Sequence, residues 1–128
     1  MRLVDNAVCS FCNSENECLD HVYWDCEATQ RFWNDFESYI TKHIQSFEIH
    51  KTVVWFGVVA DRQLLNHMIF SAKKYIYTCS LKQYQPKFRN FLHIMKETYL
   101  IEKYIAKRNN GSEKFNTKWL PLIPIFDH

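Results

Sequence analysis

The sequence predicts a mainly α-helical protein with little or no β-structure, in which a short cysteine-rich segment precedes a domain of about three helices. Glycine and proline are rare, at 2 and 3 of 128 residues, which favours long helices over a turn-rich sheet protein. Apolar residues recur at steps of three and four, the period of one helix face. Hydrophobic residues make up 47% of the chain, so a sizeable core can form.

The cysteine-rich segment carries Cys9-x-x-Cys12, then His21 and Cys26. Zinc binds sulfur and imidazole nitrogen tetrahedrally, and the two-residue gap between the first pair lets both sulfurs face one ion. The gap between His21 and Cys26 fits a single helical turn, whose side chains share a face. We therefore predict a CCHC zinc knuckle whose closed ligand set indicates a structural ion. The alternative is that these four side chains are unrelated core residues.

The remaining cysteines are given other roles. Cys79 fits a small buried hydrophobe, and Cys18 stands so close to His21 that we treat it as a bystander. An odd number of cysteines with metal-type spacing indicates a reducing, intracellular compartment, the nucleus or cytoplasm. Residues 1–8 carry charge and no apolar run, so no signal peptide is expected. The longest apolar stretch, residues 53–60, is too short to span a membrane.

A first helix should follow the knuckle directly and complete a unit over residues 1–45. Apolar residues recur at helical spacing after Glu27, whose charge suits the positive end of the helix dipole. Residues 46–59 are β-branched and aromatic, and predict either a short strand or an irregular connector ending at Gly57. The apolar stripe of the first helix consists of Phe32, Trp33, Phe36, Ile40 and Ile44.

Residues 46–128 form the second predicted unit, a basic helical segment. Asp61 suits the N-cap of a second helix, whose apolar stripe continues to Cys79. Pro86 suits the first turn of a third helix, which should stop near residues 109–111, an Asn-Asn-Gly loop signal. We expect residues 112–128 to form a docked, mostly irregular tail.

Charge is distributed unevenly along the chain. Residues 1–50 hold three Lys/Arg against nine Asp/Glu, a balance of −6, whereas residues 51–128 hold thirteen against five, a balance of +8. Cationic side chains bind phosphates without reading sequence, so the second unit is the candidate surface for RNA or single-stranded DNA. The alternative is an ordinary solvated helix face. The candidate contacts are Lys73, Lys74, Lys82, Lys87, Arg89, Lys103, Lys107 and Arg108.

The search for catalytic motifs yields none. The chain contains no glycine-rich phosphate loop, no serine-hydrolase elbow and no HExxH pair, so we expect no enzymatic activity from this chain by itself. Phe11, Tyr23 and Trp24 lie among the metal ligands, where small knuckles use aromatic rings to stack on bases. Because many acidic residues surround this site, we expect Tyr23 and Trp24 to pack on the first helix or on a partner.

The knuckle resembles a known family. The run from Cys9 to Cys26, with Glu17 four residues before His21 and with Trp33 in the following helix, resembles the zinc-binding region downstream of the reverse transcriptase in non-LTR (LINE-type) retrotransposon proteins. The metal motif is the specific part of the match, and the helical part is a looser one. The looser similarity covers residues 64–67, 72–77, 86–91, 102–106 and 118–119.

This resemblance implies that the chain corresponds to a C-terminal segment that helps a polymerase hold template RNA and target DNA. The chain lacks the polymerase palm and the endonuclease of such proteins, so by itself it would neither polymerise nor cut DNA. Cys18 stands where the family more often has a small polar residue.

Two alternatives compete with nucleic-acid binding, one functional and one not. The acidic knuckle could dock on a basic protein surface, such as the polymerase thumb of a parent protein, with zinc only holding its shape. The chain could also be a non-functional remnant of a truncated element, and poor folding in the presence of zinc would favour that hypothesis.

Overall fold

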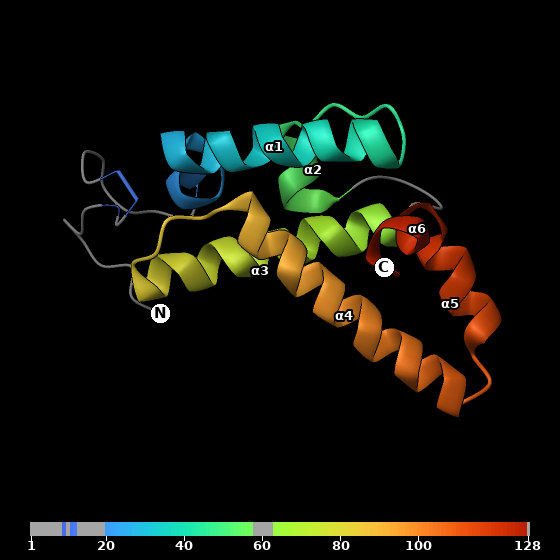
Figure 1. Cartoon of the computed structure of the whole chain (residues 1–128). Helices are drawn as coiled ribbons and strands as arrows, with labels where there is room; N and C mark the ends of the chain where they lie inside the picture. Colours follow the sequence, from blue (N-terminus) through green and yellow to red (C-terminus); the bar gives the residue numbers. More distant parts are fainter. Residues whose placement is uncertain (1–8, 10, 13–19, 58–62, 128) are drawn as a thin grey trace.

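The structure, a computed structural model, describes residues 9, 11–12, 20–57 and 63–127 (Figure 1). The predicted mainly α fold is confirmed, and no strand occurs among these residues. The predicted second-helix N-cap, Asp61, and the spare Cys18 lie outside the described residues. The elements in chain order are η1 (His21–Asp25), α1 (Glu27–His43), α2 (Lys51–Phe56), α3 (Gln63–Lys82), α4 (Phe88–Arg108), α5 (Ser112–Trp119), η2 (Leu120–Leu122) and α6 (Ile123–Phe126).

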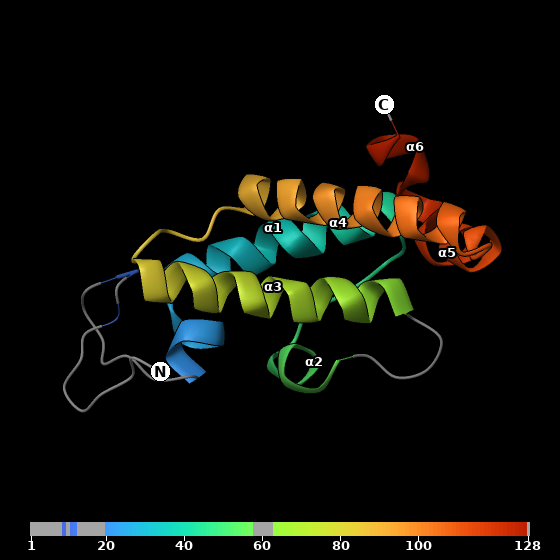
Figure 2. The same cartoon turned by 90° about the horizontal axis from the view of Figure 1, so that it is seen from below.

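Three long helices, α1, α3 and α4, form the body of the molecule (Figures 1 and 2). The short helix α2 lies against α3, and α5 turns back along the C-terminal part of α4. The short helical segment η1 packs on both α1 and α3, so it joins the body at the end opposite α5. The start of α4 therefore lies at the same end of the molecule as η1, and the end of α4 lies with α5 at the opposite end.

An aromatic core joins the three long helices. The ring of Phe32 on α1 lies 5.6 Å from Phe91 on α4 and 5.8 Å from Tyr75 on α3, measured between centroids. Phe36, one turn further along α1, lies 6.0 Å from Phe91. Phe32, Phe36 and Phe91 are fully buried, and aromatic pairs at these separations stabilise a core beyond their area alone.

A second aromatic cluster corrects the expectation of an irregular tail over residues 112–128. Residues 112–126 are docked, as predicted, but they are helical, because their apolar residues are spaced to surround Tyr99 of α4. The Tyr99 ring lies 5.2 Å from Phe115, 5.5 Å from Trp119 and 5.6 Å from Phe126. Tertiary packing therefore stabilises three short helical segments that sequence periodicity alone could not identify.

The segment predicted as a strand or an irregular connector, residues 46–59, contains the helix α2 (Lys51–Phe56). The β-branched residues of this segment favoured a strand, but the segment is a short helix that buries one side chain fully, that of Val54. The helix ends at Gly57, the predicted stop. Gly57 has a φ of +79° and faces the Asn66 side chain so closely that a Cβ would lie 2.6 Å from its Oδ1 atom.

The third long helix begins at Phe88, two residues after Pro86. Lys87 remains extended because its backbone N–H donates to the Tyr75 hydroxyl at 2.9 Å, and that hydroxyl donates to its carbonyl at 3.1 Å. The predicted stop near residues 109–111 is confirmed, with Asn110 in the left-handed region at φ 56°. None of the helices in the described ranges is long and apolar enough to cross a membrane.

Candidate metal centre and basic surface

The four predicted metal ligands come together. One donor atom each from Cys9, Cys12, His21 and Cys26 lies within 4.8 Å of the other three. The Cys9 and Cys26 sulfurs are 3.9 Å apart, and the Cys12 sulfur is 3.4 Å from His21 Nε2. Cys9 and Cys26 are fully buried and His21 is 9% exposed, so the cluster lies inside the protein rather than on its surface.

These separations fit a single tetrahedral ion. With Zn–S near 2.3 Å and Zn–N near 2.0–2.1 Å, the edges of the tetrahedron are about 3.8 Å between sulfurs and about 3.6 Å between sulfur and nitrogen. Three sulfurs and one imidazole are also the donor set that zinc prefers over hard cations. The cluster is therefore compatible with a metal such as zinc in a site whose four positions are all protein ligands.

The local backbone explains why His21 and Cys26 meet. The predicted helical turn is wider than an α-turn, because the Cys26 N–H donates to the His21 carbonyl five residues earlier at 2.8 Å. Cys26 then adopts an extended conformation, and α1 starts at the next residue. The break between η1 and α1 thus lies at Cys26, one of the four predicted metal ligands.

Side chains of α1 bind the carbonyl groups at the end of η1. Thr29 Oγ1 donates to the Val22 carbonyl at 2.6 Å, and Trp33 Nε1 donates to the Tyr23 carbonyl at 2.8 Å. The Gln30 amide donates to the next carbonyl along η1. Such terminal carbonyls have no partner within their own helix, so α1 satisfies them and fixes the orientation of η1.

The aromatic residues among the ligands pack inward, as the acidic surroundings indicated. Tyr23 and Trp24 are half-buried against the core, and the Tyr23 ring meets the edge of Trp55 on α2 at 5.7 Å. Phe11, between the first two cysteines, is buried. These rings therefore pack against the candidate metal centre and the core, and do not form an open stacking surface.

Burial strongly disfavours ionised thiols in this cluster. The pKa of Cys9 is raised to about 12, chiefly by burial and in smaller part by the neighbouring Cys26, against the lowering effect of backbone N–H groups. Burial also raises the pKa of Cys26. Without a cation both thiols would remain protonated at neutral pH, so a divalent ion is the group whose charge could compensate paired thiolates here.

The loop that carries Cys9, Phe11 and Cys12, called the metal loop below, is also attached to a distant part of the chain. Gln85, in the connection between α3 and α4, donates its amide nitrogen to the Phe11 carbonyl at 2.7 Å. The two residues are 74 positions apart. The connection between α3 and α4 therefore lies beside the metal ligands.

The eight predicted nucleic-acid contacts do not form one surface. Lys82, Lys87 and Arg89 lie around the connection between α3 and α4, next to the metal loop, whereas residues 103, 107 and 108 lie in the last turns of α4 (Figure 2). A helix of 21 residues is about 30 Å long, so the two groups are well separated. Lys73 and Lys74 lie midway along α3.

Three of the eight are engaged within the protein. Lys103 forms an ion pair with Asp127 at 2.5 Å, and Arg108 donates to the Tyr104 hydroxyl at 3.2 Å. Lys73 lies over the Trp55 ring at 5.3 Å, and burial lowers its pKa. The remaining five are exposed and form no ion pair within the described part of the chain: Lys74, Lys82, Lys87, Arg89 and Lys107.

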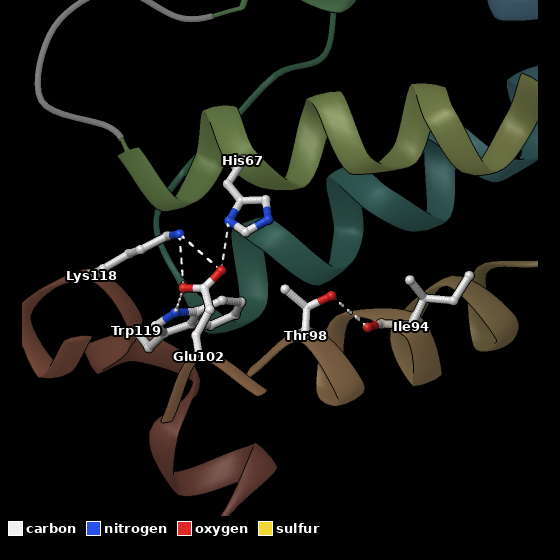
Figure 3. A network of polar contacts seen from close by, with 6 residues as sticks. All are labelled: His67, Ile94, Thr98, Glu102, Lys118 and Trp119. Atoms are coloured by element: carbon white, nitrogen blue, oxygen red, sulfur yellow. Dashed lines mark hydrogen bonds and ion pairs between the residues drawn. The ribbon is translucent and has the colours of Figure 1, made fainter. Parts of the chain in front are cut away.

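A polar network around Glu102 was not identified from the sequence (Figure 3). Its carboxylate accepts from Lys118 Nζ at 3.1 Å and from Trp119 Nε1 at 2.9 Å, and lies 3.8 Å from His67 Nδ1. The network joins α3, α4 and α5. The available signal was the helical phase of Glu102, which lies on the same face of α4 as the buried Tyr99.

Burial and the charge of Lys118 lower the pKa of His67, and these effects outweigh the raising effect of Glu102. His67 is therefore neutral at pH 7, and its contact with the carboxylate is polar but not an ion pair. The network has a structural role, because Lys118 and Trp119 of α5 both donate to Glu102 of α4 and so hold the two helices together.

In comparisons with protein-family models, curated proteins and solved structures, no match to this chain was found.

Proposed function

We propose that this chain is a zinc-stabilised module that binds RNA or single-stranded DNA beside its metal centre. The observation that carries the proposal is the hydrogen bond from Gln85 to Phe11, which attaches a basic segment of the chain to the metal loop. In this proposal the ion stabilises the segment that contacts phosphates and takes no part in a reaction.

Zinc is the proposed ion because of the donor set and its spacing. Cys9, Cys12, His21 and Cys26 supply four ligands, and their separations agree with a zinc tetrahedron. Structural zinc supplies folding energy directly, because its ligands must be brought together before it can bind. The wide turn of η1 and the loop around Phe11 are the parts that would depend on it.

The proposed contact surface is the basic loop, defined here as Lys82, Tyr84, Lys87 and Arg89. All four side chains are exposed, and Tyr84 is 64% exposed. Lysine and arginine contacts to phosphates supply salt-dependent affinity, and exposed rings stack on unpaired bases. The basic groups engaged within the protein, Lys73, Lys103 and Arg108, are assigned no direct contact.

The similarity of the metal motif to non-LTR retrotransposon reverse transcriptases gives this module a proposed context. There it would help a full-length polymerase hold its RNA template while DNA is synthesised. We assign no catalytic step to the chain, because polymerisation and strand cleavage would belong to other parts of such a protein.

The test is a salt titration of binding to single-stranded RNA and DNA, together with zinc content, on the same purified sample. Replacing Lys82, Lys87 and Arg89 by glutamine should reduce the slope of log affinity against log salt by about two, since each lost phosphate contact contributes about 0.7. The matched control replaces Lys107 and Arg108 at the end of α4 and Lys114 on α5, a change of equal charge far from the basic loop.

We expect the control triple variant to keep most of the affinity and the slope. Equal losses in the two triple variants would indicate a diffuse charge effect and would remove the basic loop from the proposal. Absence of salt-dependent binding in the zinc-loaded wild type would overturn the proposed function itself.

A second candidate function, docking on a basic protein surface, is favoured by the charge around the ligands. Asp20 and Asp25 are exposed at the two ends of η1, Glu27 is exposed at the first residue of α1, and Asp35 is exposed at the middle of α1. A partner of opposite charge would meet this face with complementary potential. Cross-linking from these carboxylates to lysines of a basic partner would support docking, whereas links from the basic loop to nucleic acid alone would count against it.

A further inference from the structure

A cavity lies beside the basic loop, where α3 ends and α4 begins. Its volume is about 420 Å³, within the range of pockets that hold small ligands. Its lining contains one cationic side chain and no carboxylate. The lining residues are Tyr75, Cys79, Gln83, Tyr84, Gln85, Lys87 and Asn90.

The lining is rich in primary amides. Gln83, Gln85 and Asn90 each carry a carbonyl acceptor and an NH₂ donor side by side, which is the pairing that matches the edge of a nucleobase. Gln85 already uses its nitrogen on the metal loop, so its orientation is fixed. The hydroxyl of Tyr75 is occupied by the backbone of Lys87 and by the Asn90 side chain, and this ring therefore serves as a wall.

Tyr84 supplies a flat surface at the mouth of the cavity. Most of its side chain is exposed, although it borders a lining of amides and Lys87. Unpaired bases stack on such rings with little dependence on base identity. Lys87 lies in the lining, and Lys82 is exposed next to Gln83 in the sequence. Arg89 lines a neighbouring hollow that also contains Asp35. The phosphates beside a bound base would therefore run past Lys87 and Lys82.

The backbone conformation of Gln83 is a separate observation. Gln83 follows the last residue of α3 with a φ of +62°, a region in which a Cβ is unfavourable. The Tyr84 N–H donates to the Cys79 carbonyl at 2.9 Å, and the Gln83 N–H donates to the Ser80 carbonyl at 3.3 Å, completing a helix-end motif that favours glycine. The chain instead holds an amide side chain here, and that side chain lines the cavity.

We infer that this cavity binds one unpaired nucleobase of the strand, stacked on Tyr84 and hydrogen-bonded by the amides of Gln83 and Asn90. The inference rests on the proposed function and deepens it, because it identifies the ligand as a single-stranded segment rather than any polyanion. Lys87 holds the adjoining phosphate. Duplex regions would be excluded, since a base stacked and paired in a duplex exposes neither its face to Tyr84 nor its Watson–Crick edge to the amides.

The test compares two probes of equal length and charge, a single-stranded oligouridylate and an abasic sugar-phosphate strand. The wild type should bind the base-bearing strand about tenfold more tightly, the effect expected from one stacked base. Tyr84→Ala should lose this preference and leave the affinity for the abasic strand unchanged. Tyr84→Phe should retain the preference, because the ring itself stacks on the base.

Gln83→Gly separates binding from folding. Glycine relieves the left-handed backbone, so the melting temperature should rise by about 3 °C, while the preference for the base-bearing strand should fall severalfold. Loss of binding in a more stable protein could not be attributed to unfolding. The control is Asn110→Gly, a similar backbone change at φ 56° after α4, which should leave binding unchanged.

The outcomes distinguish the inference from the function on which it rests. Equal wild-type affinity for the two strands would overturn the base site and leave salt-dependent phosphate binding intact. Equal weakening of both strands by Tyr84→Ala would overturn it as well. Failure to bind either strand would overturn the proposed function together with the site.

Discussion

Glu102 illustrates how a single side chain can join three helices. Its carboxylate receives hydrogen bonds from Lys118 and Trp119, both on α5, and faces His67 on α3. The side chain is 32% exposed, so the charge of its pair with Lys118 is partly screened by solvent. The bond from the buried Trp119 indole is the more demanding contact, because that N–H would lack an acceptor if the carboxylate were removed.

Glu102→Ala should lower the free energy of unfolding by about 1–3 kcal/mol, the cost of a buried donor left without its acceptor. Glu102→Gln should cost less, since an amide oxygen can still accept from the Trp119 indole. Urea unfolding of both variants measures the difference. An equal loss in the two would show that charge, rather than the indole bond, is what stabilises this contact.

His67 should make stability depend on pH. Burial lowers its pKa in the folded protein below the ordinary value of 6.5, so the unfolded chain binds more protons in that range. The stability contributed by neutral His67 is complete above about pH 6.5 and declines as the pH falls through that value. Urea unfolding of wild type and His67→Gln across this interval should show a shallower decline in the variant, and parallel curves would contradict the assignment.

The long helices were predictable because their signal is local. The apolar stripes of α1, α3 and α4 repeat over 17, 20 and 21 residues, which is enough for helical period to be recognised. The short helices α2 and α5 have 6 and 8 residues, and isolated helices of that length are marginal in water. They depend on distant contacts that no sequence window contains, which is why the strand or irregular predictions there were wrong.

Trp119 should hold the C-terminal helices in place. Trp119→Ala removes a fully buried ring between Tyr99 and Phe126, and should cost about 3–5 kcal/mol of stability. The neighbouring Leu120 is 66% exposed, so Leu120→Ala is the matched control and should change stability little. Protease cleavage within residues 112–127, followed by mass spectrometry, should increase only for the tryptophan variant.

Across the whole molecule, the predicted metal ligands could be found from the sequence, whereas the spatial grouping of the basic residues could not. The four ligands were predicted from their spacing, and the structure brings them together. The division of the basic residues between two ends of α4 depends on how the helices are arranged, and the bond from Gln85 to Phe11 spans 74 residues. The charge balance indicated a basic half of the chain, but it could not indicate which part of that half lies beside the Cys–His cluster.

Removing one ligand should therefore disrupt one end of the molecule and spare the other. We expect Cys12→Ser to abolish zinc retention and to unravel residues 1–26, because metal binding and folding are one equilibrium in such sites. The aromatic cluster around Tyr99 should remain protected, since it joins the second half of α4 to α5 and α6, away from the ligands. Metal analysis with hydrogen exchange checks both parts, and stoichiometric zinc in the variant would show that the ligand assignment is wrong.

The hydrogen bond between Gln85 and Phe11 also couples two binding equilibria, that of the nucleic-acid strand and that of the metal ion. If ordering of the metal loop raises the affinity of the neighbouring surface for a strand, the bound strand must raise the affinity for the ion by the same factor. A chelator would then extract the ion less readily from the complex than from the free protein. Such a module would keep its metal best while it is engaged and release it most readily when idle, without any further regulatory site.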